Sequence, residues 1–158
     1  MIGGNGGQTQ RDACPRGYMT GLNIGYADKI DNVQIICGEY LSIGDPEKEG
    51  ERRFGHNGHR HKSRLACPDG LVVVGFEANT GRVVDSIGLL CAPISRLDVE
   101  VPYSTEMIGG DGGRYQGAVR CNSGDAAVGI VVQHGRLIDA FSLTCNNSVD
   151  VNYDALAY

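Results

Sequence analysis

Apolar and polar residues alternate along three stretches of this chain, and each stretch follows an aspartate. A period of two places alternate side chains on opposite faces, which is typical of a β-strand with one buried side. The segments just before these stretches are short and rich in β-branched residues, and no stretch keeps a helical spacing. The pattern therefore predicts an all-β protein. The predicted core face consists of Val33, Ile35, Cys37, Ile87, Leu89, Cys91, Phe141, Leu143 and Cys145. The opposite face carries Asn32, Gln34, Ser86, Ser142 and Thr144.

An internal repeat runs through most of the sequence. Corresponding cysteines lie 53 or 54 residues apart, and the three aspartates that precede the alternating strands lie 54 residues apart. A fixed period of this size indicates a repeat architecture. The linker between two repeats is also divided between the two ends of the chain. We therefore expect a closed ring of three equivalent sheets, a β-prism with pseudo-three-fold symmetry. We predict one domain over residues 1–158, with repeats of about 2–53, 54–107 and 108–158 and with the N-terminal strand closing the ring.

Two kinds of loop recur in each repeat. The glycine-rich loops are "IGGNGGQ" at residues 2–8, "FGHNGHR" at 54–60 and "IGGDGGR" at 108–114. The loops that end in aspartate are "GRVVD" at Gly81–Asp85 and "GRLID" at Gly135–Asp139, while the first repeat has Ala27 in place of the glycine and ends at Asp31. Glycine has no Cβ, so such runs mark sharp turns or places where the backbone must approach another group closely.

The six cysteines allow fifteen disulfide connectivities, and the repeat symmetry selects one of them. Pairing within each repeat gives Cys14–Cys37, Cys67–Cys91 and Cys121–Cys145. Each bond contributes roughly 3 kcal/mol in the chain-entropy model. The alternative is six buried free thiols, because cysteine also packs as a small apolar residue. Disulfides indicate an oxidising compartment, so we expect a secreted or extracellular protein whose leader is absent from this chain.

Charge and composition exclude two classes of partner. The chain has 158 residues and a net charge of −5, with 14 Lys and Arg against 19 Asp and Glu. Binding to nucleic acid or to a membrane surface requires basic patches, so we expect neither kind of partner. No apolar run is long enough to cross a bilayer, so we expect no membrane insertion.

The recurring loops give the chain a resemblance to the jacalin-related lectins. The residues that carry it are the loops "GGNGG", "GGDGG", "GRVVD" and "GRLID", within the phrases "GFEANTGRVVDSIGLL" and "GIVVQHGRLIDAFSLT". The resemblance covers nearly the whole chain and implies a β-prism of three four-stranded Greek-key sheets. The six cysteines depart from the usual pattern of that family. A prism with cysteines also resembles, more weakly, the vitelline membrane outer layer protein family, whose tryptophans are absent here.

The chemistry of the loops suits a sugar. An ionised aspartate accepts hydrogen bonds through two oxygens, so it can bind two neighbouring hydroxyl groups of a hexose at once. The N–H groups of a glycine loop supply matching donors, and glycine leaves the backbone accessible to the ring. In the family that the chain resembles, the sugar lies between a glycine loop and a Gly-x-x-x-Asp loop. The alternative is that these glycines and aspartates only make turns.

The resemblance also implies which loops meet, and it gives three candidate sites. The first consists of Gly3, Gly4, Gly135, Arg136, Leu137 and Asp139. The second consists of Gly109, Gly110, Gly81, Arg82, Val83 and Asp85. The third combines Gly55 and His56 with Ala27 and Asp31. Because Ala27 and His56 replace glycines of the other two sites, we predict two intact sites and a degenerate third site.

Two arginines and three histidines leave alternatives open. Arg82 and Arg136 either reach a carboxylate or sulfate of a sugar or point into solvent, and we favour solvent because exposed arginines are common. His56, His59 and His61 lie close together in the sequence and would suit zinc or nickel. Their spacing matches no usual ligand pattern, so we favour a solvated loop and predict no metal or other cofactor.

A carbohydrate-binding lectin is therefore the predicted function. The alternative is a structural extracellular coat or matrix protein with the same prism, which would need no intact sugar loops. We expect no enzymatic activity, because glycoside hydrolysis needs two carboxylates roughly 5–10 Å apart and each loop offers one. The expected partners are mono- or oligosaccharides and glycoconjugates, and the sequence is compatible with a homo-oligomer.

Overall fold

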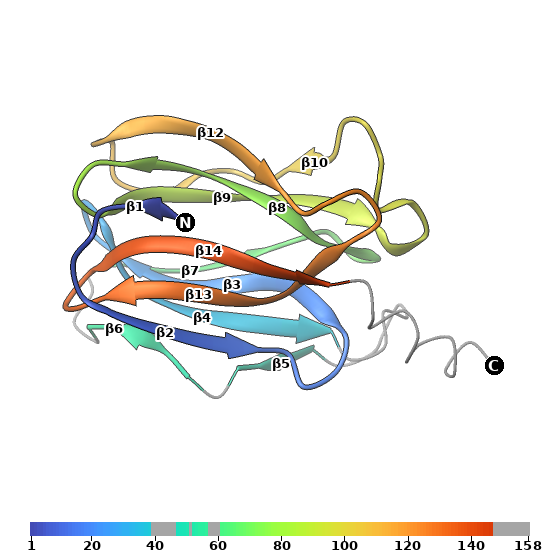
Figure 1. The fold of residues 1–158 in the computed structure, drawn as a ribbon, viewed down its shortest axis with the longest axis horizontal. Helices are drawn as coiled ribbons and strands as arrows, with labels where there is room; N and C mark the ends of the chain where they lie inside the picture. Colours follow the sequence, from blue (N-terminus) through green and yellow to red (C-terminus); the bar gives the residue numbers. More distant parts are fainter. Residues whose placement is uncertain (39–46, 51, 57–60, 147–158) are drawn as a thin grey trace.

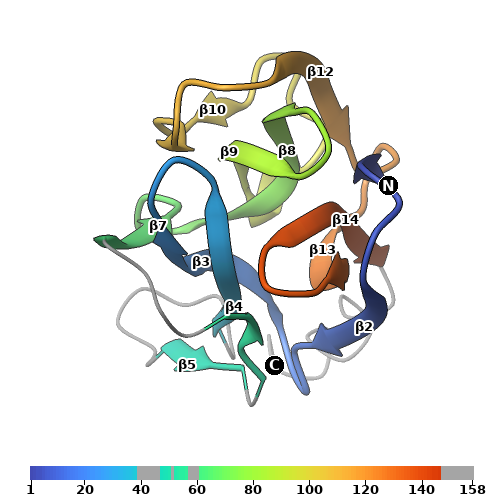
Figure 2. The same ribbon diagram turned by 90° about the vertical axis from the view of Figure 1, so that its left-hand side faces the viewer.

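The fold consists almost entirely of β-strands. It is seen in a computed structural model that describes residues 1–38, 47–50, 52–56 and 61–146. Three antiparallel sheets surround a common core, and Figure 2 shows them nearly end-on. A single 3₁₀ turn at Ile94–Arg96 follows β9, and no helix in the described ranges is long and apolar enough to span a membrane. The predicted all-β fold of three sheets is confirmed.

All three sheets share one plan, in which a long hairpin is flanked by shorter strands (Figure 1). The first sheet has the order β1 (Ile2–Gly3), β14 (Ile138–Asn146), β13 (Ala126–His134) and β2 (Gln8–Ala13). The second has the order β10 (Tyr103–Ser104), β9 (Val84–Pro93), β8 (Leu71–Thr80) and β12 (Arg114–Arg120), with β11 (Ile108–Gly109) also paired to β9. The third has the order β5 (Glu47–Glu49), β4 (Ile30–Gly38), β3 (Tyr18–Tyr26) and β7 (His61–Ala66), with β6 (Phe54–Gly55) also paired to β4.

Each sheet combines strands from two repeats. The strands that follow the glycine loops, namely β2, β7 and β12, pair with the hairpins of the third, first and second repeats respectively. The N-terminal strand β1 pairs with β14, with Ile2 opposite Phe141, and so closes the ring. A repeat of the sequence therefore does not coincide with a sheet of the structure. The strand that follows the glycine loop of each repeat pairs with the central hairpin of another repeat.

The core lies where the inner faces of the three sheets meet. Phe76 from β8 and Phe141 from β14 pack edge to face, with ring centroids 5.0 Å apart. The predicted core faces of β4 and β9 are buried, while Leu143 and Cys145 near the end of β14 are partly buried. On the opposite face, Asn32 and Ser86 are also buried. Their side chains are hydrogen-bonded, which offsets the cost of removing polar groups from water.

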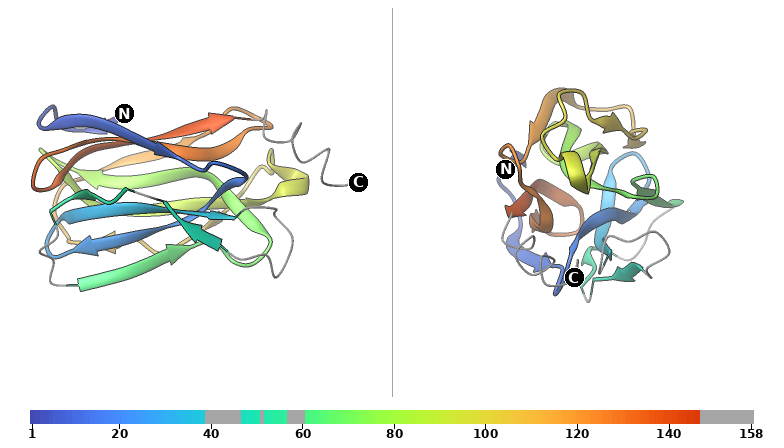
Figure 3. Two further views of the ribbon diagram at one scale, coloured as in Figure 1. Left: turned by 90° about the horizontal axis from the view of Figure 1, so that it is seen from below. Right: turned by 90° about the vertical axis from the view of Figure 1, so that its right-hand side faces the viewer.

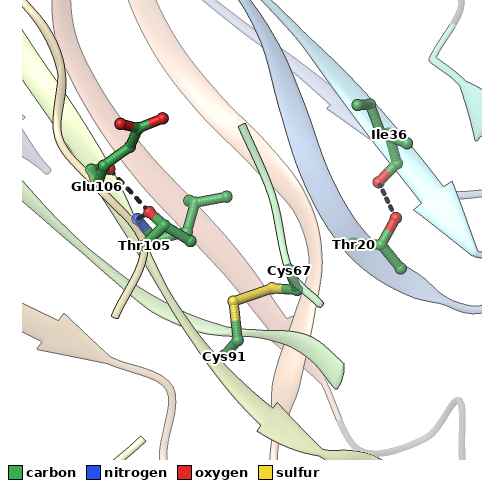
Figure 4. The surroundings of a disulfide bond; sticks show 7 residues. Thr20, Ile36, Cys67, Cys91, Thr105 and Glu106 are labelled. Carbon is green, nitrogen blue, oxygen red and sulfur yellow. Dashed lines mark hydrogen bonds between the residues drawn. A yellow bond between two sulfur atoms is a disulfide. The ribbon is translucent and has the colours of Figure 1, made fainter. Parts of the chain in front are cut away.

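Three disulfides connect the sheets in a ring. They pair Cys14 with Cys37, Cys67 with Cys91, and Cys121 with Cys145, with Cα–Cα distances of 5.7, 5.8 and 5.6 Å. In every pair, one cysteine directly follows β2, β7 or β12, and the other lies in β4, β9 or β14 of the next sheet. Figure 4 shows the Cys67–Cys91 bond. The predicted pairing is present, and it links adjacent sheets rather than strands of one sheet.

The two ends of the prism have different structures. The turns of the three central hairpins lie together at the left-hand end of Figure 1, which we call the loop end. Cys37, Cys91 and Cys145 lie near the C-terminal ends of β4, β9 and β14, away from these turns, and their disulfide partners directly follow β2, β7 and β12. The right panel of Figure 3 shows the molecule from this far end. Because the disulfides hold the three sheets at that far end, the loop end is left without covalent crosslinks between sheets.

Candidate functional site

The loop end brings each glycine loop against a hairpin turn that ends in aspartate. The N–H of Gly4 donates to the carbonyl oxygen of Asp139 at 2.8 Å, and the N–H of Gly110 donates to that of Asp85 at 2.9 Å. The N–H of His56 donates to the carbonyl oxygen of Asp31 at 3.1 Å. These are the three loop pairs that the sequence predicts, and we call them the first, second and third loop pairs in the order Asp139, Asp85 and Asp31.

Glycine is required at the start of the glycine loops in the first and second loop pairs. Gly3 and Gly109 have φ values of 131° and 132°, which residues with a side chain rarely adopt. A Cβ at either position would also collide with the carbonyl oxygen of the aspartate in its loop pair. The two loops therefore hold their backbone in direct contact with the turn that carries the carboxylate.

Each glycine loop also touches a second hairpin turn, which the sequence does not predict. A Cβ on Gly4 would collide with the carbonyl oxygen of Arg82, and one on Gly110 would collide with that of Asp28. In the third loop pair, the N–H of His56 donates a second hydrogen bond, 3.0 Å long, to the carbonyl oxygen of Arg136. Each hairpin turn is thus shared between two loop pairs, and the three loop pairs form a continuous ring.

The first loop pair holds an open pocket. Asp139 is partly exposed, and its carboxylate makes no hydrogen bond or ion pair with the described residues. The glycine loop curves around it, since a Cβ on Gly6 would lie 3.4 Å from Oδ1. The pocket has a volume of about 610 Å³ and is lined by Gly4, Asn5, Gly6, Gly81, Arg82, Val83 and Asp139.

The lining of this pocket shares Gly4 and Asp139 with the residue set expected for the first site, and Asn5 and Gly6 are lining residues that the sequence does not predict. Gly81, Arg82 and Val83 were assigned to the second site from the sequence, but they form one wall of the pocket at Asp139. Gly135, Arg136 and Leu137 belong to the same turn as Asp139 and do not line this pocket. The reason is the sharing of turns, which directs the first residues of each turn toward the neighbouring loop pair.

The second loop pair has the same backbone cradle but a different charge arrangement. A Cβ on Gly112 would lie 3.1 Å from Oδ1 of Asp85, which matches the position of Gly6 near Asp139. Asp85, however, is only 1% exposed, and its Oδ1 accepts a 2.5 Å hydrogen bond from Nζ of Lys29. The acceptor that a sugar hydroxyl would need is therefore engaged by a cation of the protein itself.

Lys29 is a residue of this loop pair that the sequence does not predict. It belongs to the turn of the first repeat, and the other two repeats have Val83 and Leu137 at the corresponding position. The signal was present as a single charged residue where the repeats are otherwise apolar. It could be interpreted only once the structure showed that this turn contacts the glycine loop of the third repeat.

The third loop pair contains both departures from the repeat pattern. Ala27 and His56 lie in the turn and the loop that meet at Asp31, and Asp31 is 9% exposed. Asn32 donates a 2.8 Å hydrogen bond to the carbonyl oxygen of His56, and Arg53 donates to Asn32. The rest of this glycine loop, including His59, lies outside the described residues. In the part of the chain that is described, no three His, Cys, Asp or Glu side chains gather as a metal site would require.

One titratable group outside the loop pairs has a shifted pKa. The hydroxyl of Tyr115 on β12 donates a 2.6 Å hydrogen bond to Oε1 of Glu77. This hydrogen bond, with smaller contributions from desolvation and from the charge of Glu77, raises the pKa of Tyr115 above its ordinary value. The raised pKa extends the pH range over which Tyr115 is neutral and donates to Glu77.

Comparison with known proteins shows which solved structures share this fold. No protein-family model matches the sequence, and no curated protein sequence is significantly similar to it. Among solved structures, a Malaysian banana lectin is 18% identical, with a TM-score of 0.66 over 92% of this chain and 94% of the lectin. The agglutinin of Calystegia sepium is 14% identical, with a TM-score of 0.68 over 92% of each chain. A mannose-binding jacalin-related lectin from Ananas comosus is 21% identical, with a TM-score of 0.64 over 90% of this chain and 92% of the lectin.

These likenesses establish the architecture. The chain has the β-prism fold of the jacalin-related lectins, as the resemblance in its loops implies.

Proposed function

We propose that the protein is a non-catalytic, carbohydrate-binding lectin and that its open sugar site is the pocket at Asp139. The observation that carries this proposal is a partly exposed carboxylate without a partner among the described residues, held beside a glycine loop. Such a carboxylate can accept hydrogen bonds from two adjacent sugar hydroxyls. The glycines leave space beside this carboxylate for the sugar ring.

A hexose with an accessible pair of neighbouring hydroxyls is the proposed ligand. The Ananas comosus lectin is described as mannose-binding, and artocarpin, which is 19% identical to this chain, was solved with methyl α-mannose. We therefore propose mannose as the first sugar to test. One ring held by few hydrogen bonds should bind weakly, with a Kd on the order of 0.1–1 mM.

The number of open sites is proposed from the charges of the three loop pairs. Asp139 is available to a ligand, Asp85 is paired with Lys29, and the third loop pair carries Ala27 and His56. We propose one open site and a degenerate third site, in place of the two intact sites expected from the loop motifs alone. The difference arises from Lys29.

Binding rather than catalysis is favoured by the lining of the pocket. Glycoside hydrolysis requires two carboxylates roughly 5–10 Å apart, and Asp139 is the one carboxylate among the described lining residues. The three disulfides support a secreted or extracellular location, because such bonds persist in oxidising compartments.

The decisive experiment measures the binding of methyl α-mannoside and of immobilised glycans. Asp139→Asn should weaken binding at least tenfold, because the amide presents a donor where the sugar hydroxyl also donates. The matched control is Asp69→Asn, an exposed aspartate in the turn after β7. We expect this control to bind as the unmodified protein does. Failure of the unmodified protein to bind any glycan would instead favour the structural coat or matrix protein.

A further inference from the structure

The pocket at Asp139 is lined by residues of two sheets, so groups other than the Asp139 carboxylate can also contact a ligand. Gly4, Asn5, Gly6 and Asp139 belong to the first sheet and its glycine loop, while Gly81–Val83 form the turn between β8 and β9 of the second sheet. That turn is closed by a 3.0 Å hydrogen bond from the N–H of Gly81 to the carbonyl oxygen of Val83. Its position is fixed further by the tight contact between Gly4 and the backbone of Arg82.

Two of the residues that line this pocket are charged, one from each wall. Asp139 belongs to one wall and Arg82 to the other. The side chain of Arg82 is exposed, and its guanidinium makes no hydrogen bond or ion pair with any residue in the described ranges. Both the acceptor and the cation of the pocket are therefore available to a ligand.

The second loop pair shows that this separation of charges is not imposed by the fold. There, a carboxylate and a cation are also contributed by two adjacent turns, but Lys29 pairs directly with Asp85. A cation and an anion that neutralise one another attract no charged ligand. At the first loop pair the two charges remain apart, so each can select a different chemical group.

We infer that the pocket at Asp139 selects an acidic saccharide. The hydroxyls of a neutral ring are held by Asp139, and a carboxylate or sulfate on the same or the adjacent ring is held by Arg82. This inference rests on the proposed sugar-binding function. The guanidinium presents a planar fork of N–H donors that matches the oxygens of a carboxylate or sulfate in a bidentate manner.

The charges also fix the orientation of the ligand. An acidic group placed beside Asp139 would be repelled by its carboxylate, so the acidic group must lie toward Arg82. The remaining lining residues are uncharged: Gly4, Asn5, Gly6, Gly81 and Val83. A volume of about 610 Å³ lies within the range of roughly 300–1,000 Å³ found for small-molecule sites, so the pocket has room for more than one ring. The net charge of −5 disfavours anions near the protein as a whole, so the attraction of an acidic sugar must come from Arg82 within the pocket.

The test compares matched pairs of glycans that differ only in one 6-O-sulfate or one uronic carboxylate. The unmodified protein should bind the acidic member of a pair about tenfold more tightly at low salt, and the preference should shrink as ionic strength rises. Arg82→Gln should reduce the ratio of acidic to neutral affinity to about one. Arg96→Gln is the matched control, since Arg96 is an exposed arginine in the 3₁₀ turn after β9 and its loss changes the net charge equally.

The outcomes separate this inference from the function on which it rests. Retention of the tenfold preference in Arg96→Gln together with its loss in Arg82→Gln supports the inference. Equal affinity of the unmodified protein for both members of every pair overturns it, and so does a preference that survives in Arg82→Gln. In those two cases, loss of neutral-glycan binding in Asp139→Asn would still uphold the proposed function. Unchanged binding in Asp139→Asn would contradict the proposed function itself.

Discussion

The first and second loop pairs have the same backbone features, but their carboxylates have different surroundings. Each has a glycine loop with a positive φ at its first glycine, a backbone hydrogen bond to the aspartate carbonyl, and a cradle of glycines around the carboxylate. At the first loop pair the carboxylate of Asp139 is available in an open pocket. At the second, Asp85 is buried and paired with Lys29.

The repeat therefore determines the backbone of a loop pair, whereas individual side chains determine whether its carboxylate is accessible or ion-paired. The turn that contacts the first glycine loop presents Arg82 and Val83, and the turn that contacts the second presents Asp28 and Lys29. A lysine is long and flexible enough to reach the carboxylate of the neighbouring turn, and valine cannot form that ion pair. The difference between Val83 and Lys29 thus accounts for the ion pair that is present at Asp85 and absent at Asp139 among the described residues.

The largest expected effect comes from disturbing the shared turns with a matched pair of variants. Gly4→Ala and Gly110→Ala each place a Cβ against a backbone carbonyl, and each should lower the free energy of unfolding by about 1–3 kcal/mol. Only Gly4→Ala should also weaken sugar binding, by at least tenfold, because it displaces a wall of the open pocket. Thermal unfolding and glycan titration of the two variants measure both effects. Equal loss of binding in both variants would show that the second loop pair also binds the sugar.

A smaller effect on stability should distinguish the two aspartates. Asp85→Asn removes the charge of a buried carboxylate that is paired with Lys29, so it should lower the free energy of unfolding by about 1–3 kcal/mol. Asp139→Asn removes a carboxylate that has no partner in the described structure, and stability should change by less than about 0.5 kcal/mol. For a domain of this size the first value corresponds to a fall in Tm of several degrees. A larger loss of stability in Asp139→Asn than in Asp85→Asn would contradict the charge arrangement.

The smallest expected effect is the appearance of a second, weaker site. Lys29→Ala frees the carboxylate of Asp85 within an intact glycine cradle. The number of sugars bound per chain, measured by isothermal titration calorimetry, should rise from one to two. The matched control is Lys62→Ala on β7, whose lysine is exposed and distant in sequence from both turns. A stoichiometry that stays at one in Lys29→Ala would mean that the second cradle does not bind sugar even when its carboxylate is released.

The sequence predicts the backbone of the molecule better than the function of its sites. The three disulfides and the closure of the ring follow from a period that every repeat obeys, and the three loop pairs follow from the resemblance to the jacalin-related lectins. Contacts between a turn and the next glycine loop depend on how sheets from different repeats pack, and no local pattern encodes that packing. The contact of Lys29 with Asp85 was missed for this reason. Arg82 was expected at the second loop pair, with its side chain in solvent, but it lines the pocket at Asp139.

We propose the open sugar site at Asp139, whereas the equivalent carboxylate of Asp85 is held by Lys29. The most direct test is a calorimetric titration of methyl α-mannoside into Asp139→Asn and Asp85→Asn, side by side with the unmodified protein. Asp139→Asn should show no measurable binding, and Asp85→Asn should retain the affinity and the stoichiometry of one sugar per chain. Loss of binding in Asp85→Asn, with binding retained in Asp139→Asn, would contradict the account.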